Sequence, residues 1–137
     1  VATTIDNRNY KEFQPFSLTS IILGPFQGHL DHPLTFDDQV GTKDDYDMAL
    51  QHFKEHKKVL RLNKFHHLQA ERICHWNNSK DEKRGGIGAY RSKETEEDYC
   101  KAIMHKWGTD TISYTIPATK MSDLLNAKKV NIPVRGV

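Results

Sequence analysis

Histidine is concentrated in one part of this chain. Of the eight histidines among 137 residues, five lie between His52 and His75. Histidine is the commonest metal ligand in proteins and the side chain whose charge changes near neutral pH. A cluster of this density indicates either a metal site or an ordinary polar helix face, and the spacing of the histidines has to decide between them.

His52 and His56 have the spacing that metal binding requires. Positions i and i+4 of a helix share a face, so two imidazoles can bind one ion. His67 would lie about 16 Å further along the helix axis, so a third ligand would have to come from a distant part of the chain. The glutamate that metalloprotease helices carry after the first histidine is replaced by Phe53. A structural zinc would fit this pair, but two histidines on a solvated helix face are the simpler interpretation, and we expect no cofactor.

The remaining candidate ligands have weaker patterns. Cys74 and His75 are adjacent, so they point in different directions on a helix, and compact zinc modules need two closely spaced pairs of ligands. Cys74 is therefore expected to be a small buried side chain. His29 and His32 form a short pair in an irregular region with nothing in the sequence to set their geometry.

A group of basic residues follows the spacing of one helix flank. Such a strip can follow the phosphates of RNA or DNA. However, the acidic stretches 37–47 and 94–98 bring the net charge to only +2, and the sequence has no recognised nucleic-acid motif. A protein that contacts RNA or DNA, such as a ribosomal protein, is therefore one alternative function, and a histidine-ligated metalloprotein is the other. Without nucleic acid, the basic face would be solvated or would contact a protein partner. The basic residues are Lys54, Lys57, Lys58, Arg61 and Lys64.

Motifs for catalysis are absent from the sequence. The glycines at 85–88 follow no predicted strand and carry no Gly-Lys-Ser/Thr, so they indicate a loop rather than a phosphate cradle. The sequence has no Gly-x-Ser-x-Gly elbow. Catalysis by paired carboxylates or by a Cys–His pair stays open, because spatial proximity cannot be read from spacing. We expect a protein without enzymatic activity.

The first 41 residues are irregular, with three of the five prolines and short apolar clusters. A stretch of this length is unusual inside an independent compact domain and less unusual in a subunit that extends over its neighbours. We expect it to be a docking arm that contacts other proteins through apolar side chains. These are Phe13, Phe16, Ile21, Ile22, Leu23 and Phe26.

A long helix is predicted from Thr42 to about residue 77. Thr42 and Asp45 resemble a capping box, and aspartates fill the first turn. The apolar residues form two stripes at well over 90° to each other, one from Tyr46 to Leu60 and the other from Leu62 to Trp76. Either the helix breaks near Asn63, or it packs against different partners along its length.

A second helix is predicted over 92–107. Ser92 is its expected cap, an apolar face follows at the helical spacing, and Gly108 ends it. Residues 111–116 alternate as a strand does, Ser122 caps a short turn, and the tail from Val130 is extended. The predicted fold is mainly α: a helical hairpin of two principal helices, one short strand and long extended terminal arms. Its core would contain Phe53, Leu60, Phe65, Ile103 and Trp107.

The domain plan follows as an arm at 1–41, the hairpin at 42–110, and a short strand with an extended tail at 111–137. Hydrophobic residues make up only 36% of the chain, which indicates a thin core completed by partners. No apolar run approaches the roughly 18–20 residues of a membrane span.

We therefore expect a non-catalytic accessory subunit of a large multi-protein assembly. The chain begins with Val1, so we expect either a fragment or a processed product. An intracellular location is expected, and import into mitochondria with removal of a presequence is one candidate for it.

Overall fold

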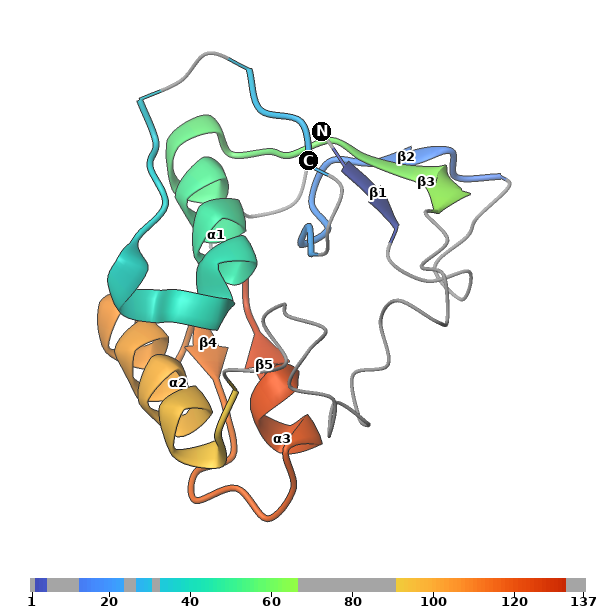
Figure 1. Ribbon diagram of the computed structural model, residues 1–137. Coiled ribbons are helices and arrows are strands. Elements are labelled where there is room, and N and C mark those ends of the chain that lie inside the picture. Colours follow the sequence, from blue (N-terminus) through green and yellow to red (C-terminus); the bar gives the residue numbers. More distant parts are fainter. Residues whose placement is uncertain (1, 5–12, 24–26, 31–32, 67–90, 133–137) are drawn as a thin grey trace, which may run out of the picture.

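The computed structural model describes residues 2–4, 13–23, 27–30, 33–66 and 91–132, and all structural statements refer to these. The fold is mixed, mostly helical with small strands, and has two principal helices (Figure 1). In chain order the elements are β1 (Ala2–Thr4), β2 (Phe16–Ser17), the 3₁₀ helix η2 (Asp38–Lys43), α1 (Asp44–His56), β3 (Arg61–His66), α2 (Lys93–Trp107), β4 (Ile112–Ser113), α3 (Ser122–Leu125) and β5 (Lys129–Val130).

The start of the first helical region differs from the prediction. The side chain of Asp37 accepts a hydrogen bond from the Gln39 amide and so caps η2. Gly41, at φ 48°, then turns the chain into α1, which begins at Asp44. Thr42 is not a cap, because its hydroxyl donates to Glu96 of α2 instead. A tertiary partner thus replaces the local capping bond that the sequence indicated.

The predicted helix to residue 77 is wrong over residues 57–66, and the rest of it, from residue 67, lies outside the described residues. Lys57 adopts the left-handed conformation at φ 62° and donates its amide to the Phe53 carbonyl, which ends α1. Residues 61–66 then form strand β3, so the second apolar stripe begins on a strand rather than on a rotated helix face. The rest of that stripe, at positions 68, 73 and 76, lies outside the described residues.

Strand β3 is the centre of a three-stranded sheet with the order β1-β3-β2. It runs parallel to β1 and antiparallel to β2, with Phe16 opposite Leu62 and Ser17 opposite Arg61. A bond from the Asn63 amide to the Pro15 carbonyl, 2.8 Å long, extends the antiparallel pairing. The expectation of one short strand is therefore wrong, because the sheet is built from segments that show no strand pattern of their own.

Helix α2 agrees with the prediction at both ends. The Ser92 hydroxyl accepts from the Thr95 amide at 3.1 Å, and Gly108 follows the last helical residue. Residues 112–113 form β4, which pairs with β5 from the expected extended tail. Ser122 is the first residue of α3 and makes no side-chain capping bond, so its predicted role as a cap is wrong.

The core consists of two clusters. In Figure 1, η2 crosses between α1 and α2, and the larger cluster fills the space where these elements meet β4 and α3. The smaller cluster joins Ile22, Phe53 and Val59 beneath the other end of α1. The larger one contains Val40, Tyr46, Leu50, Cys100, Ile103, Ile112, Tyr114, Ala118 and Leu124.

The predicted hairpin core is only partly correct. Phe53 and Ile103 are fully buried and Trp107 packs against the larger cluster, whereas Leu60 and Phe65 are exposed. Phe53 and Ile103 also belong to different clusters. The link between the two helices runs through residues 67–90, outside the described part, so the hairpin connection itself stays a prediction. The domain plan is likewise untested.

None of the helices in the described part of the chain has both the length and the apolar character to cross a membrane.

Candidate functional site

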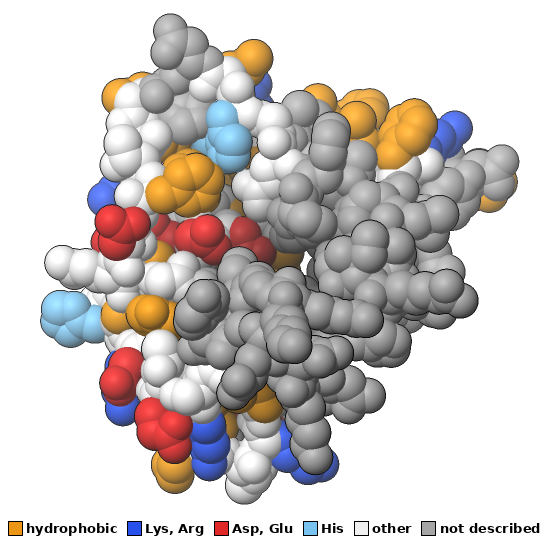
Figure 2. All heavy atoms as spheres, in the orientation of Figure 1, with side chains coloured by type: hydrophobic (Ala, Val, Ile, Leu, Met, Phe, Trp, Pro, Cys, Tyr) orange, Lys and Arg blue, Asp and Glu red, His pale blue; other side chains and the backbone are white. Residues whose placement is uncertain are grey.

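The structure brings a third histidine to the predicted pair. His52 and His56 lie on one face of α1, with ring centroids 5.5 Å apart. His29 comes from the preceding segment, and its ring stacks on that of His52 at 5.6 Å. The nitrogens His29 Nδ1 and His52 Nε2 are 3.4 Å apart. The chain thus gathers three imidazoles at the carboxyl-terminal end of α1, and Figure 2 shows histidine side chains on the surface there.

The chain segment that carries His29 is hydrogen-bonded to α1 and also has a ring contact within itself. The Gln51 side chain donates to the Thr35 carbonyl at 3.0 Å. Phe36 also contacts the His29 ring edge-on at 5.9 Å. As they stand, no three His, Cys, Asp or Glu side chains of the described ranges are arranged to hold one metal ion. The histidine cluster is therefore a set of neighbouring ligands rather than a finished coordination sphere.

Several other candidate ligands considered in the sequence lie outside the described residues. These are His32, His67, Cys74 and His75. Cys100, in contrast, is buried on α2, where its thiol donates to the Leu124 carbonyl at 3.5 Å. Burial raises the pKa of the Cys100 thiol to about 11. It is therefore a core side chain and not a reactive nucleophile.

The basic residues do not follow one helix flank. Lys54 lies on α1, Lys57 and Lys58 follow the helix end, and Arg61 and Lys64 lie on β3. The Lys57 ammonium donates back to the Lys54 carbonyl. Arg61 is half-buried, donates to the Asn63 side chain at 3.0 Å, and has its pKa lowered by burial. The straight strip expected from the sequence is therefore wrong, because the helix that would have aligned it ends at His56.

The predicted docking arm is divided by the fold. Ile22 is buried in the smaller core cluster, and Ile21 and Leu23 pack against the larger one. These three side chains pack within the chain's own fold. Phe26 lies outside the described residues. Phe13 and Phe16 remain exposed, at 97% and 52%.

A second pair of exposed apolar residues, unrecognised as such in the sequence, lies at the strand paired with β2. Leu60 immediately precedes β3 and Phe65 lies within it, and they are exposed at 38% and 61%. The β2–β3 register pairs position 16 with position 62, and continued outward it sets position 13 across from position 65. Figure 2 shows hydrophobic side chains gathered over β2 and β3. We call Phe13, Phe16, Leu60 and Phe65 the exposed ribbon residues.

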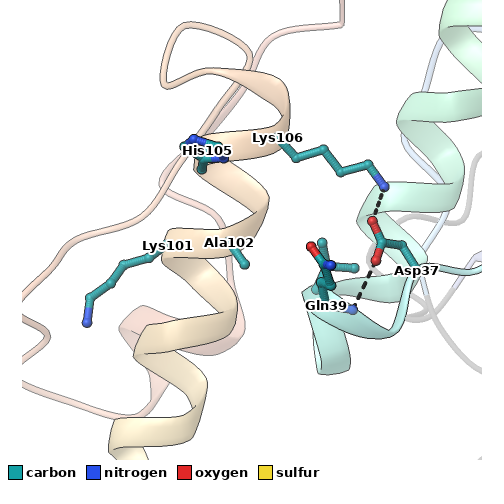
Figure 3. A pocket seen from close by; sticks show the side chains of 7 residues that line it. Asp37, Gln39, Lys101, Ala102, His105 and Lys106 are labelled. Atoms are coloured by element: carbon teal, nitrogen blue, oxygen red, sulfur yellow. Dashed lines mark hydrogen bonds and ion pairs between the residues drawn. The ribbon is translucent and has the colours of Figure 1, made fainter.

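An open hollow of about 510 Å³ lies between η2 and α2 (Figure 3). Lys106 reaches across it to Asp37 at 2.6 Å, and this bond is the main reason that the pKa of Asp37 is lowered. Burial alone would lower the pKa of Lys106, but its bonds to Asp37 and Asp47 together raise it. Lys101, also at the rim, pairs with Asp98. Because these charges already satisfy one another, the hollow is not a good site for a charged ligand.

The buried polar centre of the molecule is Glu96 of α2. Its carboxylate accepts from Lys43 at 2.6 Å and from the Thr42 hydroxyl at 2.8 and 2.9 Å. Arg91 approaches the same carboxylate at 3.1 Å. Lys43 also donates to the Leu124 carbonyl and lies over the Tyr114 ring. With every carboxylate contact made by the protein itself, the cluster holds η2 against α2 rather than presenting a reactive group.

Comparison of the chain with protein-family models, with curated proteins and with solved structures found no significant match. The function is therefore argued from the arrangement of these residues alone.

Proposed function

We propose that the protein is a non-catalytic accessory subunit of a larger protein assembly and that the exposed ribbon residues contact its partners. The observation that carries this proposal is the exposure of Phe13, Phe16 and Phe65 around the paired strands β2 and β3 of the three-stranded sheet. Single exposed apolar residues are normal on protein surfaces. A group of aromatic residues brought together by strand pairing is typical of an interface.

The chemistry of these residues favours a protein partner. Transfer of an exposed phenylalanine from water into an apolar environment contributes about 1.5–3 kcal/mol, and aromatic side chains are enriched among interface residues that dominate affinity. Because side chains alternate across a strand, positions 13 and 16 are expected to point to opposite faces of the ribbon. A partner that encloses the ribbon would therefore bury more apolar area than one that covers a single face.

The nucleic-acid alternative has less support. The basic residues follow a helix end, a turn and a strand, and two of them contact groups of their own chain. Lys54, Lys58 and Lys64 are exposed, but they are not aligned by one element. If they did bind phosphates, Lys58→Glu with Lys64→Glu would reduce both the affinity for RNA and its dependence on salt. We expect no salt-sensitive binding for either the variant or the native sequence.

The proposal is tested by the size of the particle that contains the chain. Tagged wild-type protein and the variant Phe13→Ser/Phe65→Ser are expressed in cells that make this protein, and extracts are separated by native size. We expect the wild type in a particle much larger than its own 15.8 kDa and the variant largely at its own mass. Met121→Ser is the matched control, because Met121 is an exposed apolar residue of a different region.

Two results would contradict the proposal. One is equal assembly of the wild type and the phenylalanine variant. The other is a purified wild-type chain that reaches the same large size by itself, which would make a second copy the partner. A mitochondrial location of the assembly stays a prediction.

A further inference from the structure

We propose that His29, His52 and His56 form a binding site for one divalent transition-metal ion, with zinc as the probe. The site goes beyond the proposed docking function and does not depend on it. Neutral imidazole is a good ligand for zinc, copper, nickel and iron. The structure supplies what the sequence lacks, a third imidazole from outside α1.

The distance between the ring nitrogens supports a shared ion. In a tetrahedral zinc site, nitrogen ligands at 2.0–2.1 Å from the metal are about 3.3–3.4 Å from each other. His29 Nδ1 and His52 Nε2 are 3.4 Å apart. Without metal the two ring nitrogens can share a hydrogen bond, and the same separation suits two ligands of one ion.

His56 is the third member of the proposed group. It lies one turn after His52 on the same face of α1, with the two rings 5.5 Å apart. The rings as they stand do not converge on a single point, so the ion would draw His56 inward by rotation of an exposed side chain. His56 is also the last residue of α1, where the carbonyl end of the helix favours positive charge.

The bound ion would connect two segments of the chain. His29 belongs to the segment that Gln51 of α1 already holds through the Thr35 carbonyl. Three protein ligands leave a fourth position for water or for a ligand from a partner. A metal at this point would stabilise the segment at residues 27–30 against the end of α1, and the melting temperature would rise with added metal because the ion binds the folded state.

The test is a zinc titration of the full-length protein by calorimetry, with stoichiometry checked by native mass spectrometry. We expect about one zinc per chain for the wild type and affinity at least about tenfold lower for His29→Gln and for His52→Gln, because loss of even an outer-shell partner costs about 10–100-fold. His56→Gln should weaken binding in the same direction. His105→Gln, an exposed histidine on α2, is the matched control and should bind as the wild type does.

A second measurement needs no variants. Diethyl pyrocarbonate modifies accessible imidazoles, and peptide mapping shows whether zinc protects His29 and His52 while leaving His105 reactive. Wild-type affinity in His29→Gln, absence of stoichiometric zinc in the wild type, or protection confined to other histidines would each overturn the site. Loss of binding in His67→Gln/His75→Gln with full binding in His29→Gln would also overturn it and would assign the metal to a different histidine pair.

Discussion

At the scale of single residues, the main feature of this protein is a buried pair of opposite charges. Glu96 is 0% exposed and Lys43 2%, yet both are charged groups in contact. Taking such groups out of water is costly unless each is paired and hydrogen-bonded. Here the carboxylate is bonded by Lys43 and Thr42 and approached by Arg91, and the ammonium has a second acceptor in the Leu124 carbonyl. The pairing therefore determines how η2 and α2 meet.

Glu96→Gln is expected to destabilise the protein strongly. The change leaves Lys43 buried without its counter-charge, so the free energy of unfolding should fall by about 3–5 kcal/mol. Urea denaturation measures it. Asp98→Asn is the control on the same helix, because Asp98 and its partner Lys101 are both exposed, and little change is expected there. Similar losses for the two variants would contradict a special role for the buried pair.

Tyr114 presents the opposite case, a buried hydroxyl without a hydrogen-bond partner among the described residues. Tyr114→Phe should leave the free energy of unfolding unchanged or raise it by up to about 1 kcal/mol, since no bond is lost. Lys43 can still lie over the ring. Tyr46→Phe is the control, because the Tyr46 hydroxyl accepts from the Ala127 amide and its loss should be destabilising.

Tyr114 should also make the stability of the protein depend on pH in the alkaline range. Burial raises the pKa of Tyr114 in the folded protein. Above about pH 10 the phenol ionises in the unfolded chain while it stays neutral in the folded one, so stability falls as pH rises. Cys100 adds to this fall as the pH rises toward its folded pKa of about 11. Unfolding at about pH 8 and about pH 10.5 should show a smaller loss for Tyr114→Phe than for the wild type, and an equal loss would refute the assignment.

At the scale of elements, the ends of one helix are set by nearby residues, whereas the start of the other depends on a contact with a distant residue. The Ser92 cap, the apolar face and Gly108 set α2 within its own residues. The ends of helix α1 are determined differently. Before its first turn, the Thr42 hydroxyl donates to Glu96 instead of capping the helix, and at its other end Lys57 adopts the left-handed conformation. The capping bond of Ser92 therefore makes a local contribution to the stability of the protein that can be measured. Ser122 is also a residue type that often caps helices, but it makes no capping bond.

Ser92→Ala should lower the free energy of unfolding by about 1 kcal/mol, because the Thr95 amide loses its acceptor. Ser122→Ala should have a much smaller effect. Chemical denaturation of both variants beside the wild type measures the difference. A larger effect at Ser122 than at Ser92 would contradict the assignment of Ser92 as the stabilising cap.

At the scale of the whole molecule, α1 joins the two core clusters. Tyr46 and Leu50 pack in the larger cluster, and Phe53, one turn later, packs in the smaller one with Ile22 and Val59. The Val59 amide also bonds to the Leu18 carbonyl at 2.9 Å, next to the ribbon. The helical part and the sheet are therefore connected through one helix, and we expect them to unfold together.

Phe53→Ala should reduce the free energy of unfolding by about 3–5 kcal/mol in a single transition, because it removes the centre of the smaller cluster. Phe65→Ala should change stability by no more than about 0.5 kcal/mol, since Phe65 is exposed. Both variants are tested by thermal unfolding and by urea unfolding, each followed with two spectroscopic probes. Two separate transitions in Phe53→Ala would contradict the connection, and strong destabilisation by Phe65→Ala would weaken its use in the assembly experiment.

The sequence by itself determined the elements whose signals lie within a few residues. Helix α2 was predicted with both its ends, the buried face of α1 from Tyr46 to Phe53 was recognised, and the strand near residue 112 was found. The His52–His56 pair belongs to the same class, because helical spacing alone places both rings on one face. These features follow from backbone geometry and hydrophobic periodicity, which need no distant partner.

Only the tertiary structure decided the rest. Residues 61–66 have no strand pattern and form β3 because segments near residues 3 and 16 pair with them. His29 meets His52 across 23 positions and Lys43 meets Glu96 across 53, with no local signal for either contact. Contacts of this kind are selected by burial and by satisfaction of hydrogen bonds over the whole fold, which spacing along the chain does not record.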